Sequence, residues 1–340
     1  MRRLPAEWEP QSGVMLTWPH ADTDWADHLD RVEALYAELA ALIGRFERVV
    51  IVCRDRDHAE RARGLTTRAG TDPARLDLGI APSNDTWARD YGPISLLTDQ
   101  GRILLLDFRF NGWGGKFSAD LDDRITGRLA AGGLFGDARL ETSDLVLEGG
   151  AIETDGQGTL LAVTRTLVDP LRNPCRSRAD IEHELTARLG IRHFLWLEHG
   201  GISGDDTDGH IDTLARFCDP RTICYARCDN PLDADFAELA AMEAELEALR
   251  DPAGHPYRLI PLPCPASILN EDGARLPAGY ANFLIVNDAV LLPVYDDPAD
   301  EQARAILGDL FPSRDILTLD CRPLIRQGGS LHCISMQLPG

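Results

Sequence analysis

Short polar clusters that contain a cysteine, a histidine and several carboxylates recur along the chain. They occupy residues 84–90, 147–150, 205–212, 279–282 and 327–333. A cysteine that works with a histidine is typical of an activated nucleophile and its general base, and nearby carboxylates favour a bound cation. From these clusters we take as candidate site residues Asp90, Glu148, His210, Asp212, Asn282 and Cys333.

A thiol needs help to act as a nucleophile in such surroundings. A free cysteine has a pKa near about 8.5, so only a few per cent is thiolate at neutral pH, and neighbouring carboxylates raise that pKa further. A bound cation would reverse this effect. The best chemical match is a guanidinium, because it is planar, always charged and pairs with carboxylates in a bidentate manner. The sequence therefore predicts attack by the thiolate of Cys333 on a guanidinium carbon.

Each candidate also has a structural interpretation. Cys333 alone could be a small buried apolar residue. His210 and Asp212 would share one face if they lay on a strand. They could then be a metal-ligand pair, or a core histidine oriented by a carboxylate. Residues 205–209 resemble part of a calcium loop, but Gly204 stands where the first acidic ligand is needed. No further histidine or cysteine has zinc-type spacing, so we predict no metal site.

Two tryptophans are candidates for substrate contacts. Trp87 and Trp113 would more commonly be core residues, yet either could stack on a guanidinium. The glycine-rich loop 111–117 contains Lys116, the only lysine of the chain. It lacks the Ser or Thr of a phosphate-binding loop, so we discount phosphate binding.

The elements that must position these residues follow a repeating pattern. Runs rich in β-branched and aromatic residues form four predicted hairpins around short turns. A helix-period segment and a short apolar strand follow most hairpins. The hairpins span 91–110, 151–163, 211–226 and 282–295; the helical segments span 119–132, 177–190, 232–250 and 298–310; the last strands span 193–197, 257–260 and 316–319.

A fifth strand–strand–helix–strand unit can be assembled from the two ends of the chain. Its parts are 333–337, 13–18, 23–46 and 49–53, and residues 57–80 add an extra helix and strand. Repeats that cannot bury their own faces close on one another. We therefore predict a five-bladed α/β propeller with pseudo-fivefold symmetry, in which 1–340 is a single catalytic domain. A plain α/β sandwich is the alternative.

Composition narrows the classes of partner. The chain has 340 residues, enough for a full core, and a formal net charge of −21. That charge disfavours nucleic acid and anionic membranes, and no apolar run is long enough to span a bilayer. The first residues lack the apolar stretch of a signal peptide, and the eight cysteines are scattered, so we expect a cytoplasmic protein with reduced thiols. The oligomeric state stays open, a homo-oligomer included.

At this point the motifs resemble a known family. Matching stretches cover nearly the whole chain in order, at 5–11, 16–19, 84–93, 107–115, 148–150, 207–217, 280–283 and 328–337. They resemble the agmatine deiminase and Porphyromonas-type peptidylarginine deiminase family, within the guanidino-modifying pentein superfamily of five-bladed α/β propellers. The resemblance implies that Cys333 is the nucleophile and His210 the general acid/base. It also implies that Asp90 and Asp212 grip the guanidinium, that Glu148 orients the guanidinium and His210, and that Asn282 supports the pocket without metal or cofactor.

The function that the resemblance implies is hydrolytic deimination of a small cationic guanidino compound. Agmatine would give N-carbamoylputrescine and ammonia through a covalent amidino intermediate on cysteine. Deimination of free or peptidyl arginine is the main alternative, since the stretches 329–333 and 208–210 depart from the agmatine deiminase pattern. An arginine substrate would want a cationic partner for its carboxylate, such as Arg89 or Arg109. An amidinotransferase and a non-catalytic member of the superfamily are further alternatives.

Overall fold

The computed structural model describes residues 2–340, which form a mixed α/β fold. Within these residues the strands form five separate sheets, none of which closes on itself. Three sheets have three strands each: β8 (Glu153–Thr154), β9 (Thr159–Val163) and β10 (His193–Leu197); β11 (Ala215–Asp219), β12 (Thr222–Arg227) and β13 (Arg258–Pro263); β14 (Leu284–Val286), β15 (Ala289–Val294) and β16 (Asp315–Asp320).

The other two sheets have four strands each and use the ends of the chain. They comprise β1 (Arg2–Arg3), β5 (Ile94–Thr98), β6 (Ile103–Arg109) and β7 (Arg139–Val146); and β17 (Ser335–Pro339), β2 (Gln11–Thr17), β3 (Arg48–Cys53) and β4 (Leu76–Ile80). In the second of these, C-terminal β17 runs antiparallel to N-terminal β2, with Ser335 opposite Leu16. This is the fifth unit that the sequence predicts, and the predicted extra helix and strand are α2 (Arg56–Ala69) and β4, which adds to β3 in parallel.

All five sheets contain the same order of strand pairings. An antiparallel pair comes first, and a parallel strand then joins the second member of the pair, as in β8–β9–β10. A parallel pair needs a crossover, usually a helix. The crossover helices are α1 (Leu29–Ile43), α5 (Ile125–Ala131), α7 (Arg178–Leu189), α8 (Phe236–Ala248) and α9 (Ala299–Leu310). The strand–strand–helix–strand unit is therefore confirmed.

Helix α7 shows how the sequence sets these boundaries. The Ser177 hydroxyl accepts from the Asp180 backbone N–H while the Asp180 carboxylate accepts from the Ser177 N–H, a reciprocal N-terminal cap. The helix ends at Gly190, whose φ of 76° is the left-handed conformation that favours glycine. Its buried side chains Ile181, Leu185 and Leu189 follow the helical period.

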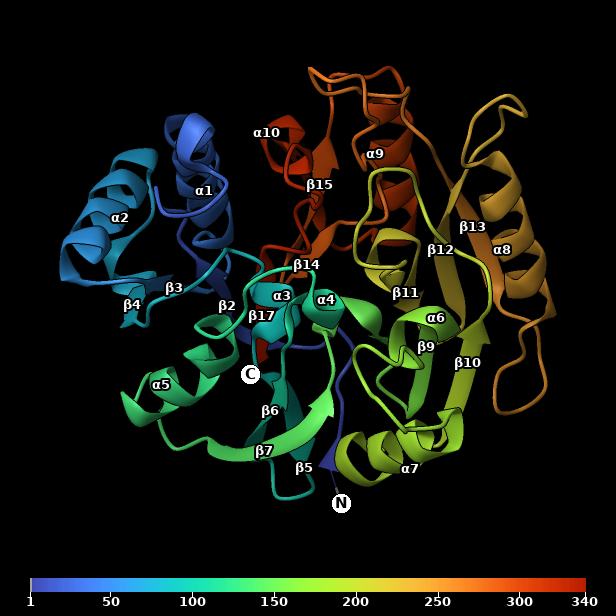
Figure 1. Ribbon diagram of the computed structural model, residues 1–340, viewed down its shortest axis with the longest axis horizontal. Coiled ribbons are helices and arrows are strands. Elements are labelled where there is room, and N and C mark those ends of the chain that lie inside the picture. Colours follow the sequence, from blue (N-terminus) through green and yellow to red (C-terminus); the bar gives the residue numbers. More distant parts are fainter. Residues whose placement is uncertain (1) are drawn as a thin grey trace.

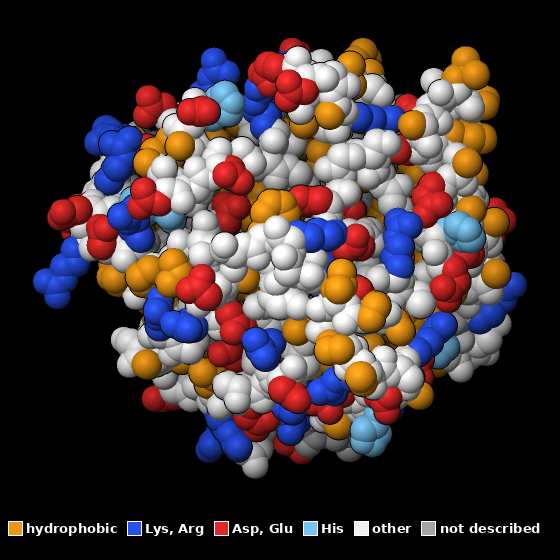
Figure 2. Space-filling view, viewed as in Figure 1, with side chains coloured by type: hydrophobic (Ala, Val, Ile, Leu, Met, Phe, Trp, Pro, Cys, Tyr) orange, Lys and Arg blue, Asp and Glu red, His pale blue; other side chains and the backbone are white. Residues whose placement is uncertain are grey.

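The crossover helices lie around the outside of the molecule, and the short helix α3 (Ala88–Tyr91) lies near its middle (Figure 1). Middle strands are buried on both faces and read as continuous apolar runs, as in Val49–Val52. On the face of the molecule shown in Figure 2, acidic and basic side chains are interspersed over most of the surface. The remaining short helical turns are η1 (Ala26–His28), η2 (Pro73–Arg75), α4 (Gly112–Gly115), η3 (Asp122–Arg124), η4 (Gly149–Ala151), α6 (Thr164–Leu167), η5 (Ile211–Thr213) and α10 (Arg322–Ile325).

The predicted strands that carry candidate site residues begin too early. The strand predicted from residue 91 begins at Ile94, after α3, and the strand predicted from residue 211 begins at Ala215, after η5. His210 and Asp212 therefore do not lie on a strand, so the shared strand face considered for them does not exist. Alternation of polar and apolar residues fits either conformation over so few residues.

Candidate active site

The candidate residues occupy the segments that lead into an antiparallel strand pair in each sheet, the pair β5–β6 in the sheet that also contains β1. Asp90 lies in α3, before β5, and Glu148 directly precedes η4 and β8. Asp212 lies in η5, with His210 just before it, and these lead into β11. Asn282 and Cys333 precede β14 and β17. All five sheets therefore contribute to one set of polar residues.

Gly150 marks the point where three of these side chains meet. A methyl group added there would lie 2.5 Å from His210 Nδ1, 2.9 Å from Asp90 Oδ1 and 3.1 Å from Asp212 Oδ2. Only a residue without a side chain allows this approach. The Glu-Gly-Gly sequence of the second cluster thus supplies a carboxylate and the space beside it.

His210 is held between two carboxylates in a fully buried position. Its Nε2 lies 2.7 Å from Glu148 Oε2, and its Nδ1 lies 3.5 Å from Asp90 Oδ1. Burial alone would lower the pKa of His210, but the charges of Asp90 and Glu148 outweigh it and raise the pKa to about 9. His210 is therefore an imidazolium at neutral pH and holds a proton to give away.

Glu148 is fixed on its far side by a buried arginine. Arg172 Nε lies 2.8 and 3.0 Å from the two carboxylate oxygens of Glu148. Burial raises the pKa of Glu148, but the hydrogen bond and charge of His210 and the charge of Arg172 lower it overall. The carboxylate is therefore ionised and favours the charged form of His210.

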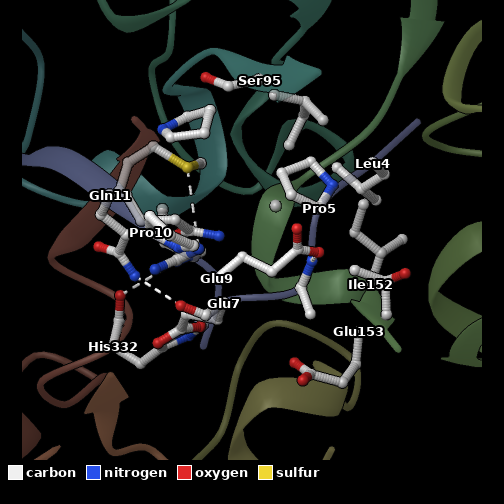
Figure 3. Close-up of a pocket in the computed structure, with 18 residues that line it drawn as sticks. Leu4, Pro5, Glu7, Glu9, Pro10, Gln11, Ser95, Ile152, Glu153 and His332 are labelled. Atoms are coloured by element: carbon white, nitrogen blue, oxygen red, sulfur yellow. Dashed lines mark hydrogen bonds and ion pairs between the residues drawn. The ribbon is translucent and has the colours of Figure 1, made fainter. Parts of the chain in front are cut away.

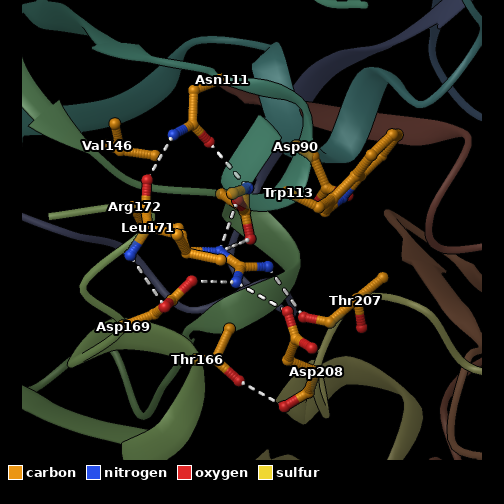
Figure 4. A network of polar contacts seen from close by, with 12 residues as sticks. Asp90, Asn111, Trp113, Val146, Thr166, Asp169, Leu171, Arg172, Thr207 and Asp208 are labelled. Atoms are coloured by element: carbon orange, nitrogen blue, oxygen red, sulfur yellow. Dashed lines mark hydrogen bonds and ion pairs between the residues drawn. The ribbon is translucent and has the colours of Figure 1, made fainter. Parts of the chain in front are cut away.

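Arg172 belongs to a wider network (Figure 4). Its Nη1 lies 2.8 Å from Asp169 Oδ2 and 2.8 Å from Asp208 Oδ2, and its Nη2 donates to the Thr207 carbonyl at 2.8 Å. Lys116 Nζ reaches the same Asp208 oxygen at 2.7 Å. No motif surrounds Arg172, so it was not among the predicted site residues. Its role follows from its contact with Glu148, which exists only in the folded chain.

Asp90 accepts two hydrogen bonds from the residues around it. Gly150 N–H donates to Oδ1 at 3.0 Å and Trp113 Nε1–H donates to Oδ2 at 2.9 Å. Burial raises the pKa of Asp90 to about 6, against the opposing effect of His210. Near neutral pH the carboxylate is ionised.

Asp212 is bound on one oxygen only. His332 Nδ1 lies 2.7 Å from Oδ2. Among residues 2–340, no group hydrogen-bonds to the buried Oδ1. Burial raises the pKa of Asp212, but the hydrogen bond and charge of His332 lower it overall. Asp212 therefore offers an ionised acceptor, which is costly to leave unpaired and suits a cationic ligand.

Cys333 lies beside Asn282. The thiol donates to Asn282 Oδ1 at 3.4 Å, and the same oxygen accepts from the His332 N–H at 2.9 Å. Burial, followed by the charges of Asp212 and Asp90, raises the pKa of the thiol well above its ordinary value. As the sequence predicted, the neighbouring carboxylates add to the effect of burial and favour the protonated thiol.

A pocket of about 310 Å³ opens onto Cys333 and Asp90. Trp87 and Trp113, the two candidates for aromatic substrate contacts, both line it. The loop that carries Trp113 differs from a regular helix, since Trp113 has φ 55° and Gly114 has φ 82°. This turn directs the indole toward Asp90.

Neither of the two arginines suggested for a substrate carboxylate lines this pocket. Arg89 lines a different cavity, shown with its neighbours Glu7 and His332 in Figure 3. Arg109 is exposed on β6. The arginines that do line the Cys333 pocket are Arg275 and Arg326, which the sequence analysis did not single out.

Residues 2–340 contain no group of three or more histidine, cysteine or acidic side chains that could hold a metal ion. They also contain no helix with the length and apolar character needed to cross a bilayer.

Comparisons with known proteins agree over the full length. The family model for Porphyromonas-type peptidyl-arginine deiminase matches residues 3–339. The agmatine deiminase of Stutzerimonas stutzeri is 35% identical, over 99% of this chain and 95% of its own. A substrate-bound agmatine deiminase of C. jejuni is 33% identical with a TM-score of 0.92, over 100% and 97%. A Porphyromonas gingivalis structure, provisionally described as an arginine deiminase, is 50% identical with a TM-score of 0.92, over 100% and 98%.

Proposed function

Because the chain belongs to the Porphyromonas-type peptidyl-arginine deiminase family, it is a hydrolase that acts on C–N bonds of guanidino groups, and we propose that its substrate is agmatine. The observation that carries the proposal is the meeting of Asp90, Asp212 and His210 at one point, beside a pocket that reaches Cys333. The products would be N-carbamoylputrescine and ammonia, which links the enzyme to polyamine synthesis.

The charge of the pocket supports a substrate with a cationic tail. Four carboxylates line it, and both of its arginines are already paired with acidic residues, Arg275 with Asp233 and Arg326 with Glu271. The lining carboxylates belong to Asp24, Asp85, Asp90 and Asp206. Agmatine ends in an ammonium, which these groups attract, whereas the carboxylate of free arginine would be repelled.

Substrate binding would activate the nucleophile. The guanidinium would bind between Asp90 and the free oxygen of Asp212, where its charge offsets the two carboxylates that raise the pKa of Cys333. The thiol would then lose its proton to solvent. Since His210 is already protonated, it does not serve as the base in this step.

The first chemical step forms the covalent intermediate. The Cys333 thiolate adds to the guanidinium carbon and gives a neutral tetrahedral adduct. His210 donates its proton to one amino group, the C–N bond breaks, and ammonia leaves. The product is a cationic amidino-thioether on Cys333, still balanced by the carboxylates around it.

Water completes the reaction. Neutral His210 accepts a proton from water, and the resulting hydroxide adds to the amidino carbon. The C–S bond breaks, the thiolate is restored and the ureido product forms with loss of one proton. His210 is then an imidazolium again, so the site is ready for the next substrate.

We also propose that the five sheets are the blades of an α/β propeller around the site, and that 1–340 acts as a single catalytic domain. Supporting this, a candidate residue precedes the antiparallel pair of every sheet, and one of the five sheets pairs the two ends of the chain. The eight cysteines are all free thiols, which supports the proposed cytoplasmic location.

Ammonia release from a substrate panel tests the function. We expect turnover with agmatine, little with arginine or arginyl peptides, and none for Cys333→Ala with agmatine. Cys53→Ala is a matched control, because this thiol is buried in β3 and its pKa is also raised by burial. Preference for arginine would refute the substrate, and turnover by Cys333→Ala would refute the mechanism.

A further inference from the structure

His332 immediately precedes the nucleophile in sequence, and its ring bridges two carboxylates. Its Nδ1 lies 2.7 Å from Asp212 Oδ2 and its Nε2 lies 2.8 Å from Glu7 Oε2. The side chain is almost completely buried. The proposed chemistry uses Cys333, but it leaves this histidine without a task.

Both partners of the ring are ionised carboxylates. Burial raises the pKa of Glu7, but the charges of Arg216 and His332 bring it well below its ordinary value. The pKa of Asp212 is also lowered overall, against burial. Because an ionised carboxylate only accepts hydrogen bonds, the contact between His332 Nδ1 and Asp212 Oδ2 needs Nδ1–H as the donor.

Glu7 is a fixed anchor for this ring. Arg216 Nη2 lies 2.6 Å from Glu7 Oε2, and the Ile285 N–H donates to Oε1 at 2.7 Å. Figure 3 shows His332 beside Glu7, in the cavity that does not contain Cys333. The ring thus joins the active-site carboxylate Asp212 to a rigid ionic cluster that lies outside the Cys333 pocket.

We propose that His332 is a positioning residue for the substrate-binding carboxylate: its Nδ1–H holds Oδ2 of Asp212 and leaves Oδ1 free for the guanidinium. The inference rests on the proposed function. Its independent support is geometric, since Oδ2 is the bound oxygen and Oδ1 is the buried one without a partner among residues 2–340. A carboxylate tied at one oxygen cannot rotate away from its ligand.

Other charged groups face this part of the site. Arg89 is buried nearby, and its Nε donates to the His332 carbonyl at 3.3 Å. The charges of His210 and Arg216 also lower the pKa of Asp212, each by less than His332 does. These cations remain in any His332 variant, so the variant isolates the contribution of the ring.

Two substitutions separate the two contacts of the ring. The amide nitrogen of asparagine is as many bonds from Cα as Nδ1, and that of glutamine as many as Nε2. His332→Asn therefore keeps a donor for Asp212, whereas His332→Gln keeps a donor for Glu7 only. We expect kcat/KM for agmatine to fall by less than about tenfold in the first and by about tenfold to a hundredfold in the second, mostly through KM.

The pH profile separates positioning from general damage. Without its donor, Asp212 is protonated more readily because burial dominates, so the acid limb of kcat/KM moves to higher pH in His332→Gln and less in His332→Asn. Melting temperatures of both variants check the fold. If both variants fold poorly, the ring ¹⁵N shifts of His332 in the wild-type protein decide, since a protonated Nδ1 supports the proposal and an unprotonated Nδ1 overturns it.

The outcomes distinguish the two proposals. Equal kinetics and equal acid limbs for the two folded variants, with active wild type, would overturn the positioning role alone. A wild-type protein that releases no ammonia from any guanidino compound would refute the proposed function as well.

Discussion

Replacement of Arg172 by methionine tests whether the network behind Glu148 supports both the fold and the catalytic histidine. The side chain of Arg172 is 2% exposed and contacts three carboxylates and one carbonyl. Methionine fills much of the same volume but donates no hydrogen bond. Of the charged groups in residues 2–340 that hydrogen-bond to the buried Glu148, His210 alone would then remain.

The magnitude follows from the burial of the ion pair. Removing one partner of a buried pair costs about 3–5 kcal/mol, because the other charge remains without compensation. The pKa of Glu148 is lowered in the native protein, so the stability that it contributes is present above about pH 4.5 and is lost as the pH falls. The difference between wild type and Arg172→Met should therefore be full at pH 7 and smaller at pH 4.

The same change alters catalysis in a defined direction. If Glu148 takes up a proton in the variant, it no longer raises the pKa of His210, which falls from about 9. The basic limb of the kcat/KM profile should therefore move to lower pH. Urea unfolding at both pH values and ammonia release from pH 6 to 10 measure the two effects.

Arg304→Met is the matched control, because Arg304 pairs with Glu301 on the exposed side of α9 and exposed pairs of this kind contribute little. We expect no measurable change in its unfolding or pH profile. A destabilisation of Arg172→Met below about 1 kcal/mol at pH 7, together with an unmoved basic limb, would refute the reasoning.

Three further outcomes follow from the site. The pKa of His210 is raised to about 9, so the stability of wild type relative to His210→Gln should be greatest below about pH 6.5 and should decline by a few kcal/mol as the pH rises through 9. Urea unfolding measures this difference, and an increase over that range would contradict the assignment. The pKa of Asp90, raised to about 6, predicts that kcat/KM falls below about pH 6; full activity at pH 5 would show that this carboxylate is not required in its ionised form. Gly150→Ala would place a methyl group 2.5 Å from His210 Nδ1, so ammonia release should fall at least about tenfold, and unchanged activity in a folded variant would exclude the proposed position of the imidazole.

Much of the architecture could be predicted from local patterns. The helices after the hairpins, the last strands and the pairing of the two chain ends all follow from apolar periodicity and turn residues, as in α7 and β10. The meeting of Asp90, His210 and Asp212 could be predicted because equivalent positions in repeated units come together. What failed was local: α3 and η5 replaced predicted strand residues, since a short alternating stretch fits a helical turn as well as a strand.

The order of amino acids limits the available chemistry to one cysteine, one histidine and several carboxylates at equivalent positions of five similar units. Which other side chains support these groups depends on the folded chain. Arg172 lies outside every motif, and the motifs that contain His332 and Glu7 gave these two residues no role. All three matter because distant parts of the chain bring Arg172 against Glu148, and Glu7 and Asp212 against His332. Contacts of this kind depend on distances across the folded molecule, and local spacing along the chain does not encode them.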